Sequence, residues 1–182
     1  MDDILTLLTT RRSNRELGLP APDELQTDTI LQAATQVPDH GKLQPWRFIV
    51  IHTEEGRRRL HTVLENAAKA LNLGEETEAK AKTVAYFAPL ILAVIASPKK
   101  GKPEWEQQMS AASAAYAAQL AAKAQGFDSV WITGLWVNTD GLRAAFDCTE
   151  QEKIIGLVMI GTAQNHSDEP KNCDTSAYTA YW

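Results

Sequence analysis

The sequence contains only two cysteines, Cys148 and Cys173, and they do not form a CxxC pair. Two isolated cysteines provide neither the disulfide framework of a small secreted domain nor the ligand set of a structural zinc site. The four histidines, at positions 40, 52, 61 and 166, have no metal-ligand spacing with them. We therefore expect reduced thiols, no bound metal and a cytoplasmic protein.

Long hydrophobic runs are also missing. The stretch from Ala88 to Ala96, which is among the longest, falls far short of the roughly 20 residues that cross a bilayer. The N-terminus begins with acidic residues rather than with a basic region and an apolar stretch, so we expect no signal peptide. Eighteen basic and 23 acidic residues give a formal net charge of -5, which argues against an extended basic surface for nucleic acid. Any site for an anionic ligand must be local.

Several common functional motifs are absent as well. The chain has no GxGxxG, GxxxxGK[ST], GxSxG or HExxH sequence. Hypotheses that rest on a protein nucleophile or a metal therefore begin without support, and we assign no catalytic residue.

The composition is that of one globular domain spanning residues 1–182, with 44% hydrophobic and 23% charged residues. Segments rich in β-branched and aromatic residues predict strands at 46–51, 90–95, 130–133 and 157–160. Apolar residues on both faces of these segments predict that helices cover both sides of the sheet. Helical periodicity predicts a first helix within residues 1–10, a second ending near Val37, and others over 54–71, 75–86, 104–125 and 139–146.

The helix predicted over 104–125 has an unusual composition. Nine of the 14 residues from Ala111 to Ala124 are alanine. Apolar residues recur along one stripe at Trp105, Met109, Ala112, Tyr116 and Leu120. Because alanine permits close approach on several sides, we expect this helix to lie at the centre of the domain or of a subunit interface.

Three short segments could carry chemistry. The cluster Arg11-Arg12-Ser13-Asn14-Arg15 at the end of the first helix could bind a phosphate, or its cations could simply complement the helix dipole. The loop from Pro38 to Trp46 carries His40, Lys42 and Gln44 before a strand, where rigid loops commonly hold ligands. The third segment, Trp131-Ile132-Thr133-Gly134, is a strand end that could approach a flat ligand or simply terminate in a turn.

Taken together, the order and spacing of these segments resemble the FMN-dependent nitroreductase family. The shared features are RRSxR after a first helix, PDHxxxQPW entering a strand, a long Ala-rich helix ending in Gly, and then Trp-x-Thr-Gly. The resemblance covers nearly the whole chain and is closest to the short, single-domain bacterial branch. It implies an α+β fold: a three-layer α/β/α sandwich with a mixed, mainly antiparallel sheet, in an intertwined homodimer that shares FMN between subunits.

The resemblance also implies roles for the basic cluster. Arg11, Arg12 and Ser13 match positions that hold the FMN phosphate and ribityl chain, and Arg15 matches a position near the pyrimidine edge of the ring. A guanidinium at that edge favours the reduced flavin, which gains negative charge there.

Other residues match the remaining sides of the flavin. Gln36, His40 and Gln44 correspond to contacts with the flavin bound mainly by the partner subunit, whereas Trp131, Ile132 and Thr133 match the strand end under the ring.

Two departures from the family pattern concern charge. Relatives in the short branch often carry a basic residue where Gln36 stands, and Arg or Lys where Ile132 stands. Lys171 is the nearby substitute for a basic pair that other members carry near the C-terminus.

The activity implied by the resemblance is that of an oxidoreductase. NAD(P)H would reduce bound FMN, which would then reduce a nitro compound, quinone or similar acceptor. Two alternatives remain open: a flavin-binding or ligand-sequestering protein with little turnover, and a purely structural dimer whose basic cluster only caps a helix. The sequence leaves open both the acceptor and the choice between NADH and NADPH.

Overall fold

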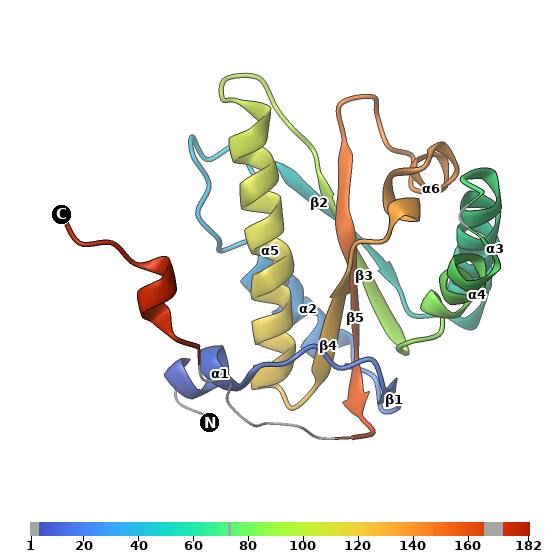
Figure 1. Cartoon of the computed structure of the whole chain (residues 1–182), viewed down its shortest axis with the longest axis horizontal. Coiled ribbons are helices and arrows are strands. Elements are labelled where there is room, and N and C mark those ends of the chain that lie inside the picture. The colour runs from blue at the N-terminus through green and yellow to red at the C-terminus, as the bar shows by residue number, and fades with distance from the viewer. Residues whose placement is uncertain (1–3, 73, 166–172) are drawn as a thin grey trace.

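A computed structural model describes residues 4–72, 74–165 and 173–182. Its centre is a five-stranded sheet (Figure 1). The central strand β5 pairs with β3 on one side and with β4 on the other. Strand β3 in turn pairs with the edge strand β2. The short β1 pairs with the last residues of β5. The strands are β1 Leu17–Gly18, β2 Trp46–Ile51, β3 Leu90–Ala96, β4 Asp128–Ile132 and β5 Lys153–Ala163.

Helices cover both faces of this sheet, as the sequence predicts (Figure 1). One face is covered by α2 (Glu24–Ala34) and α5 (Glu104–Ala124). The other is covered by α3 (Glu54–Ala70), α4 (Glu75–Val84) and α6 (Asp140–Ala145). The expected three-layer α/β/α sandwich is therefore confirmed.

The remaining elements are short. Helix α1 (Ile4–Thr10) lies against α5. The 3-10 turn η1 (Leu135–Asn138) follows β4, and the 3-10 turn η2 (Thr175–Tyr178) lies in the C-terminal segment 173–182. Of the described helices, none is long and apolar enough to cross a membrane.

The strand pairs of the sheet are all antiparallel in the described chain. The expected mainly antiparallel pairing is thus confirmed, and the parallel pairing between Ser13 and Ser129 is an isolated bridge outside the named strands. This bridge joins the segment after α1 to the start of β4.

Strand β3 shows why its sequence is apolar throughout. Side chains alternate between the two faces of a strand, so Ile91, Ala93 and Ile95 enter the core under α3 and α6. Leu92 and Val94 enter the second core, under α2 and α5. Every residue of β3 is buried, as predicted.

Strand β2 differs from its prediction. Of its residues only Ile51 is buried, and the other five are half-buried. The reason is its position at the edge of the sheet, with a paired neighbour on one side only. Apolar composition alone does not distinguish an edge strand from a central one.

Two other strands, β5 and β1, also differ from what the sequence predicts. Strand β5 extends from Lys153 to Ala163, well beyond the predicted 157–160, because backbone pairing continues through exposed and polar residues at its ends. Strand β1, at Leu17–Gly18, was not predicted, because two residues are too few to show a period.

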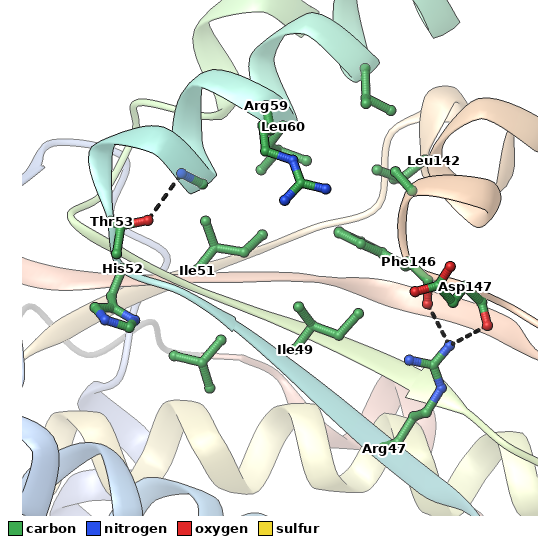
Figure 2. Close-up of a pocket in the computed structure, with 14 residues that line it drawn as sticks. Arg47, Ile49, Ile51, His52, Thr53, Arg59, Leu60, Leu142, Phe146 and Asp147 are labelled. Atoms are coloured by element: carbon green, nitrogen blue, oxygen red, sulfur yellow. Dashed lines mark hydrogen bonds between the residues drawn. The ribbon is translucent and has the colours of Figure 1, made fainter.

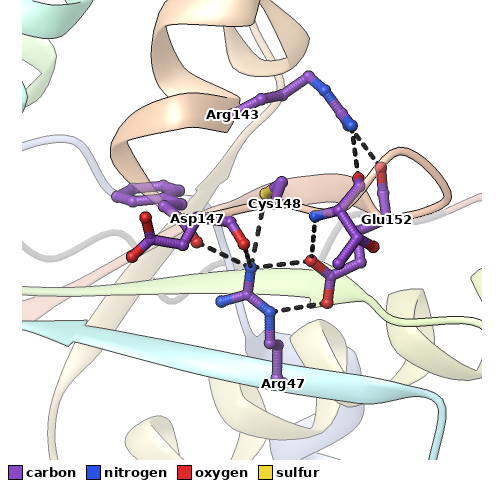
Figure 3. A network of polar contacts seen from close by, with 7 residues as sticks. Arg47, Arg143, Asp147, Cys148 and Glu152 are labelled. Atoms are coloured by element: carbon purple, nitrogen blue, oxygen red, sulfur yellow. Dashed lines mark hydrogen bonds and ion pairs between the residues drawn. The ribbon is translucent and has the colours of Figure 1, made fainter.

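An ion pair between half-buried Arg47 and buried Glu152 links the edge strand to the chain between α6 and β5 (Figure 3). Arg47 of β2 donates from Nε to Glu152 Oε1 at 2.7 Å and from Nη2 to Oε2 at 3.0 Å. Arg47 Nη2 also donates to the carbonyl oxygen of Phe146 at 2.8 Å, and the Thr149 N–H donates to Glu152 Oε2 at 2.9 Å. The hydrogen bond from Arg47 is the main cause that lowers the pKa of Glu152 to about 2.

This network predicts an acid-dependent contribution to stability. Glu152 binds a proton less readily in the folded chain than in the unfolded one, so its contribution is complete above about pH 4.5 and is lost as the pH falls toward 2. We expect Glu152→Gln to lower the free energy of unfolding by about 3 kcal/mol at pH 7, measured by urea unfolding. The difference from the unmodified protein should fall to less than about half at pH 3.

Glu150→Gln is the matched control, because Glu150 lies in the same loop with an exposed side chain. It should leave the unfolding free energy nearly unchanged at both pH values. A Glu152→Gln deficit that is the same at pH 7 and pH 3 would show that the charge of Glu152 is not what stabilises the loop.

Candidate functional site

The basic cluster that follows α1 runs beside the start of β4. The Asn14 N–H donates to the carbonyl oxygen of Ser129 at 3.0 Å, next to the bridge between Ser13 and Ser129. Asn14 Nδ2 donates to Asp128 Oδ2 at 3.1 Å, and Lys123 of α5 pairs with Asp128 Oδ1 at 2.9 Å. These contacts hold the cluster against both α5 and the sheet.

The first two arginines of the cluster have different surroundings. Arg12 donates from Nη1 to the carbonyl oxygens of Thr9 and Arg11, both at 2.8 Å, and so caps the last turn of α1. Arg11 instead places its guanidinium carbon 6.0 Å from the centre of the Tyr116 ring of α5. Its Nη1 is buried without a hydrogen-bond partner in the described chain. The helix-cap interpretation therefore fits Arg12, and the anion-binding interpretation fits Arg11.

The buried Nη1 of Arg11 matters because an unpaired, buried donor lowers the stability of the fold. A buried donor on a charged group that lacks an acceptor is destabilising, so such donors are normally paired. Ser13 and Arg15 lie beside it with exposed side chains that form no hydrogen bond within the described residues. A ligand with anionic oxygens would supply the missing acceptors.

The loop before β2 is held in a defined shape. Gly41, Lys42 and Gln44 have left-handed φ angles of 93°, 55° and 49°. The Gln44 N–H donates to Asp39 Oδ2 at 2.6 Å, while Asp39 Oδ1 is buried without a partner among the described residues. Non-glycine residues in this region of φ mark a constrained loop, which agrees with the rigidity expected from the sequence.

His40, in the same loop, reaches α5. Its Nδ1 lies 2.6 Å from Glu106 Oε2, and its side chain remains 61% exposed. Gln36 and Gln44 are exposed on either side of it. The segment therefore exposes three polar side chains, of which His40 is the one that contacts the beginning of α5.

The strand end after β4 places successive side chains on opposite faces. Trp131 lies on the α5 side, donates from Nε1 to the Ile155 carbonyl oxygen at 3.3 Å, and packs against Gly156, where a Cβ would come within 2.2 Å of its indole nitrogen. Ile132 packs into the opposite core, under α3 and α6. Thr133 is exposed at the end of the strand. Of the three predicted site residues, Ile132 can thus offer a ligand only its backbone.

The predicted site residues form two separate groups in one chain. Arg11 contacts α5 at Tyr116, whereas His40 contacts it at Glu106. At 1.5 Å per residue these two positions are about 15 Å apart along the helix. The basic cluster lies beside β4, which contains Trp131 and is followed by Thr133. The loop that carries His40 and Gln44 instead contacts the beginning of α5.

The sequence patterns did not identify three residues of this region as part of a site. Asp39 stood in the predicted loop, where an aspartate that accepts a backbone N–H is a common turn signal. Tyr116 belonged to the stripe on the long helix, but nothing linked it to Arg11. Glu106 had no signal, because it lies 66 residues from His40. Lys171, expected near the phosphate, lies outside the described residues.

Comparison with known proteins identifies the family of the chain. Residues 8–162 match the model of the nitroreductase family. A Haemophilus influenzae protein named "Putative NAD(P)H nitroreductase" is 48% identical over 183 residues, covering 98% of this chain and 99% of that protein.

Solved structures show the same fold. A nitroreductase-like family protein from Bacillus cereus has a TM-score of 0.85 at 20% identity, covering 100% of this chain and 97% of that one. A Clostridium difficile protein described as an FMN-dependent nitroreductase has a TM-score of 0.74 at 22% identity, covering 98% of each chain. By the extent of the family match and the identity to its full-length relative, the chain belongs to the nitroreductase family.

Proposed function

We propose that this chain is a flavin-dependent oxidoreductase that binds FMN between two copies of itself. NAD(P)H serves as electron donor, and a small nitro compound, quinone or similar molecule serves as acceptor. The observation that carries the proposal is the buried, unpartnered Nη1 of Arg11, a local site for an anionic group in a chain with a net charge of -5. The names of the Haemophilus influenzae and Clostridium difficile proteins support the choice of donor and cofactor.

The residues of the basic cluster divide the work of binding. Arg11 and Ser13 bind the phosphate and ribityl end, because both have unused hydrogen-bonding groups beside β4. Arg12 contributes to the same end and orients the cluster by capping α1. Arg15 is exposed and places a positive charge at the pyrimidine edge of the ring.

The strand end and the loop complete the site from two subunits. Trp131 and Thr133 lie under the ring, with the backbone of Ile132 between them. Gln36, His40 and Gln44 come from the partner subunit, which explains why one chain keeps them apart from Arg11.

FMN, when bound, supplies the transfer of hydride and electrons. The chain orients the donor and the acceptor on the ring, excludes water from it and adjusts its electrostatic environment through Arg15. None of these tasks needs a protein acid or base.

The homodimer is supported by apolar side chains left exposed in a single chain. The stripe predicted on the long helix faces away from the sheet, with Trp105 61%, Met109 60% and Tyr116 38% exposed. The segment 173–182 extends away from the domain and exposes Tyr178 and Tyr181 (Figure 1). Several large apolar side chains exposed along one helix face and the C-terminal segment are typical of an interface between proteins.

We therefore expect a stable dimer in solution. Sedimentation equilibrium should give twice the chain mass at micromolar concentration, and Met109→Glu should shift the protein toward monomer by placing a charge in the interface. Glu104→Gln, at an exposed position near the start of the same helix, is the control and should leave the mass unchanged. A monomer that binds FMN with full affinity would rule out the shared site.

Arg11 should act on cofactor affinity. Arg11→Gln removes the charged contact to the phosphate, so the dissociation constant for FMN, measured by flavin fluorescence, should rise about ten- to a hundredfold. Arg12→Gln should mainly lower the melting temperature of the protein without FMN, because it removes the cap of α1. If Arg11→Gln binds FMN normally but melts early, Arg11 is structural and the phosphate site must lie elsewhere.

The activity itself is tested by anaerobic reduction. The visible spectrum of the purified protein should show bound flavin. NADH or NADPH should bleach this flavin absorbance at least as fast as the protein turns over a nitroaromatic or quinone in the steady state. Bound flavin that neither nucleotide reduces would favour the ligand-sequestering alternative. A colourless protein that does not take up FMN would favour the structural dimer.

Arg15→Gln sharpens this test. Loss of its charge should lower the two-electron potential of the bound flavin by roughly 30 mV for each tenfold loss in relative affinity for the reduced form. Reduction by the nucleotide should slow, while retention of oxidised FMN changes little. An unchanged flavin potential and an unchanged rate of reduction would show that Arg15 does not lie beside the flavin ring.

A further inference from the structure

A cavity of about 490 Å³ lies on the face of the sheet opposite α5 (Figure 2). It is bounded by the edge strand β2, by α3 and by α6. Strands β5 and β3 separate β2 from β4, so the cavity and the strand end proposed for the flavin are roughly 14 Å apart across the sheet at about 4.8 Å per strand. The cavity is therefore separate from the proposed flavin site and has no role in it.

Apolar side chains form a large part of the lining of this cavity. Ile49 and Ile51 of β2 form one side, and the others are formed by Leu60, Val63, Leu142 and Phe146. Its volume lies within the range of small-molecule sites. An apolar body of eight to ten heavy atoms would remove this surface from water, which favours binding.

Arg59 of α3 supplies a positive charge at the cavity. Its two neighbours on the helix are neutralised, since Arg57 pairs with Glu54 and Arg58 with Glu55. Arg59 forms no ion pair or hydrogen bond within the described chain. Figure 2 shows its guanidinium directed from α3 into the space between β2 and α6.

The other polar groups at the cavity are engaged or lie at its ends. Arg47 is neutralised by Glu152. Thr53 accepts the Gly56 N–H at 3.0 Å and caps α3, with His52 next to it. The Asp147 carboxylate lies beside Arg47, near α6 rather than on α3 (Figure 2). Arg59 is thus the cation without an internal partner, and an anion is the complementary ligand at that point.

We propose that this cavity binds an apolar monocarboxylate. The carboxylate pairs with the Arg59 guanidinium, whose planar fork matches two carboxylate oxygens, and the apolar body lies against Ile49, Ile51 and Phe146. A medium-chain acyl group and an aromatic ring both satisfy this description, and the two differ in shape rather than in the chemistry of recognition.

The test is calorimetric titration of the protein as purified with octanoate and with 2-naphthoate. Each should bind with one site per chain, and the tighter one identifies the body as acyl or aromatic. Octyltrimethylammonium, which has the same chain and the opposite charge, should bind at least tenfold more weakly than octanoate. Equal binding of the two octyl compounds would show that the cavity has no preference for an anion and would overturn the proposal.

Substitutions locate the binding. Arg59→Gln should weaken octanoate about tenfold, the size of one charged contact at an exposed site. Arg58→Gln is the matched control, because it removes the same charge from the adjacent helix position outside the cavity and should leave affinity unchanged. Ala145→Trp, at an exposed lining position, should block the cavity and reduce binding without loss of fold. Binding that survives both Arg59→Gln and Ala145→Trp, or no saturable binding in the unmodified protein, would overturn the proposal.

Discussion

The close packing of α5 on the sheet is the constraint on which the rest of this molecule depends. The inward face of the helix is built from small residues that are completely buried: Ala111, Ala114, Ala115, Ala118 and Ala122. Because alanine adds little bulk, the helix axis can approach β3, β4 and β5 closely. Exchanging one of these alanines for a larger side chain would push the helix from the sheet or force strained rotamers.

Two buried glutamines fix where along the sheet this helix lies. Gln107 accepts the Lys99 N–H at 2.8 Å and donates to the carbonyl oxygens of Lys99 and Lys102, both at 2.9 Å. Near the other end, Gln119 donates to Ser129 Oγ of β4 at 3.2 Å. Buried amides with these partners specify one register of helix against strand, since any shift would leave them unpaired. Both groups of site residues contact this helix, through Arg11 at Tyr116 and His40 at Glu106, so its position also influences their separation.

The same packing decides what faces solvent. An ordinary surface helix turns its bulky apolar residues toward the core, whereas α5 turns alanines inward and leaves Trp105, Met109 and Tyr116 outside. The sequence predicted that the helix would be central to the domain or to an interface. The structure confirms the first for its alanine face and, through the exposed stripe, supports the second.

How much could be predicted from the sequence depended on the range of each interaction. Strand β3 and the helices were predictable because period and composition are local properties. The different roles of Arg11 and Arg12 were not, because both are arginines at a helix end and only the approach of Tyr116 separates them. The same limit applies to Glu152 with Arg47, which are 105 residues apart and have no pattern in common. The cavity beside Arg59 forms where β2, α3 and α6 come together at the edge of the sheet, and no sequence motif predicts that these elements do so.

The two sides of the sheet differ in how complete they are within one chain. On the α5 side, the basic cluster and the His40 loop are about 15 Å apart along the helix, and the apolar stripe nearby remains exposed among the described residues. On the α3 side, the cavity has its apolar walls and its cation from a single chain. With the proposed FMN site shared between two copies, binding on the first side would depend on protein concentration through dimer formation, whereas binding in the cavity proposed on the second side would not. This difference in completeness follows from the helices themselves: α5 places its bulk outward, whereas α3 buries Leu60 and Leu64 and holds Arg59 at the rim.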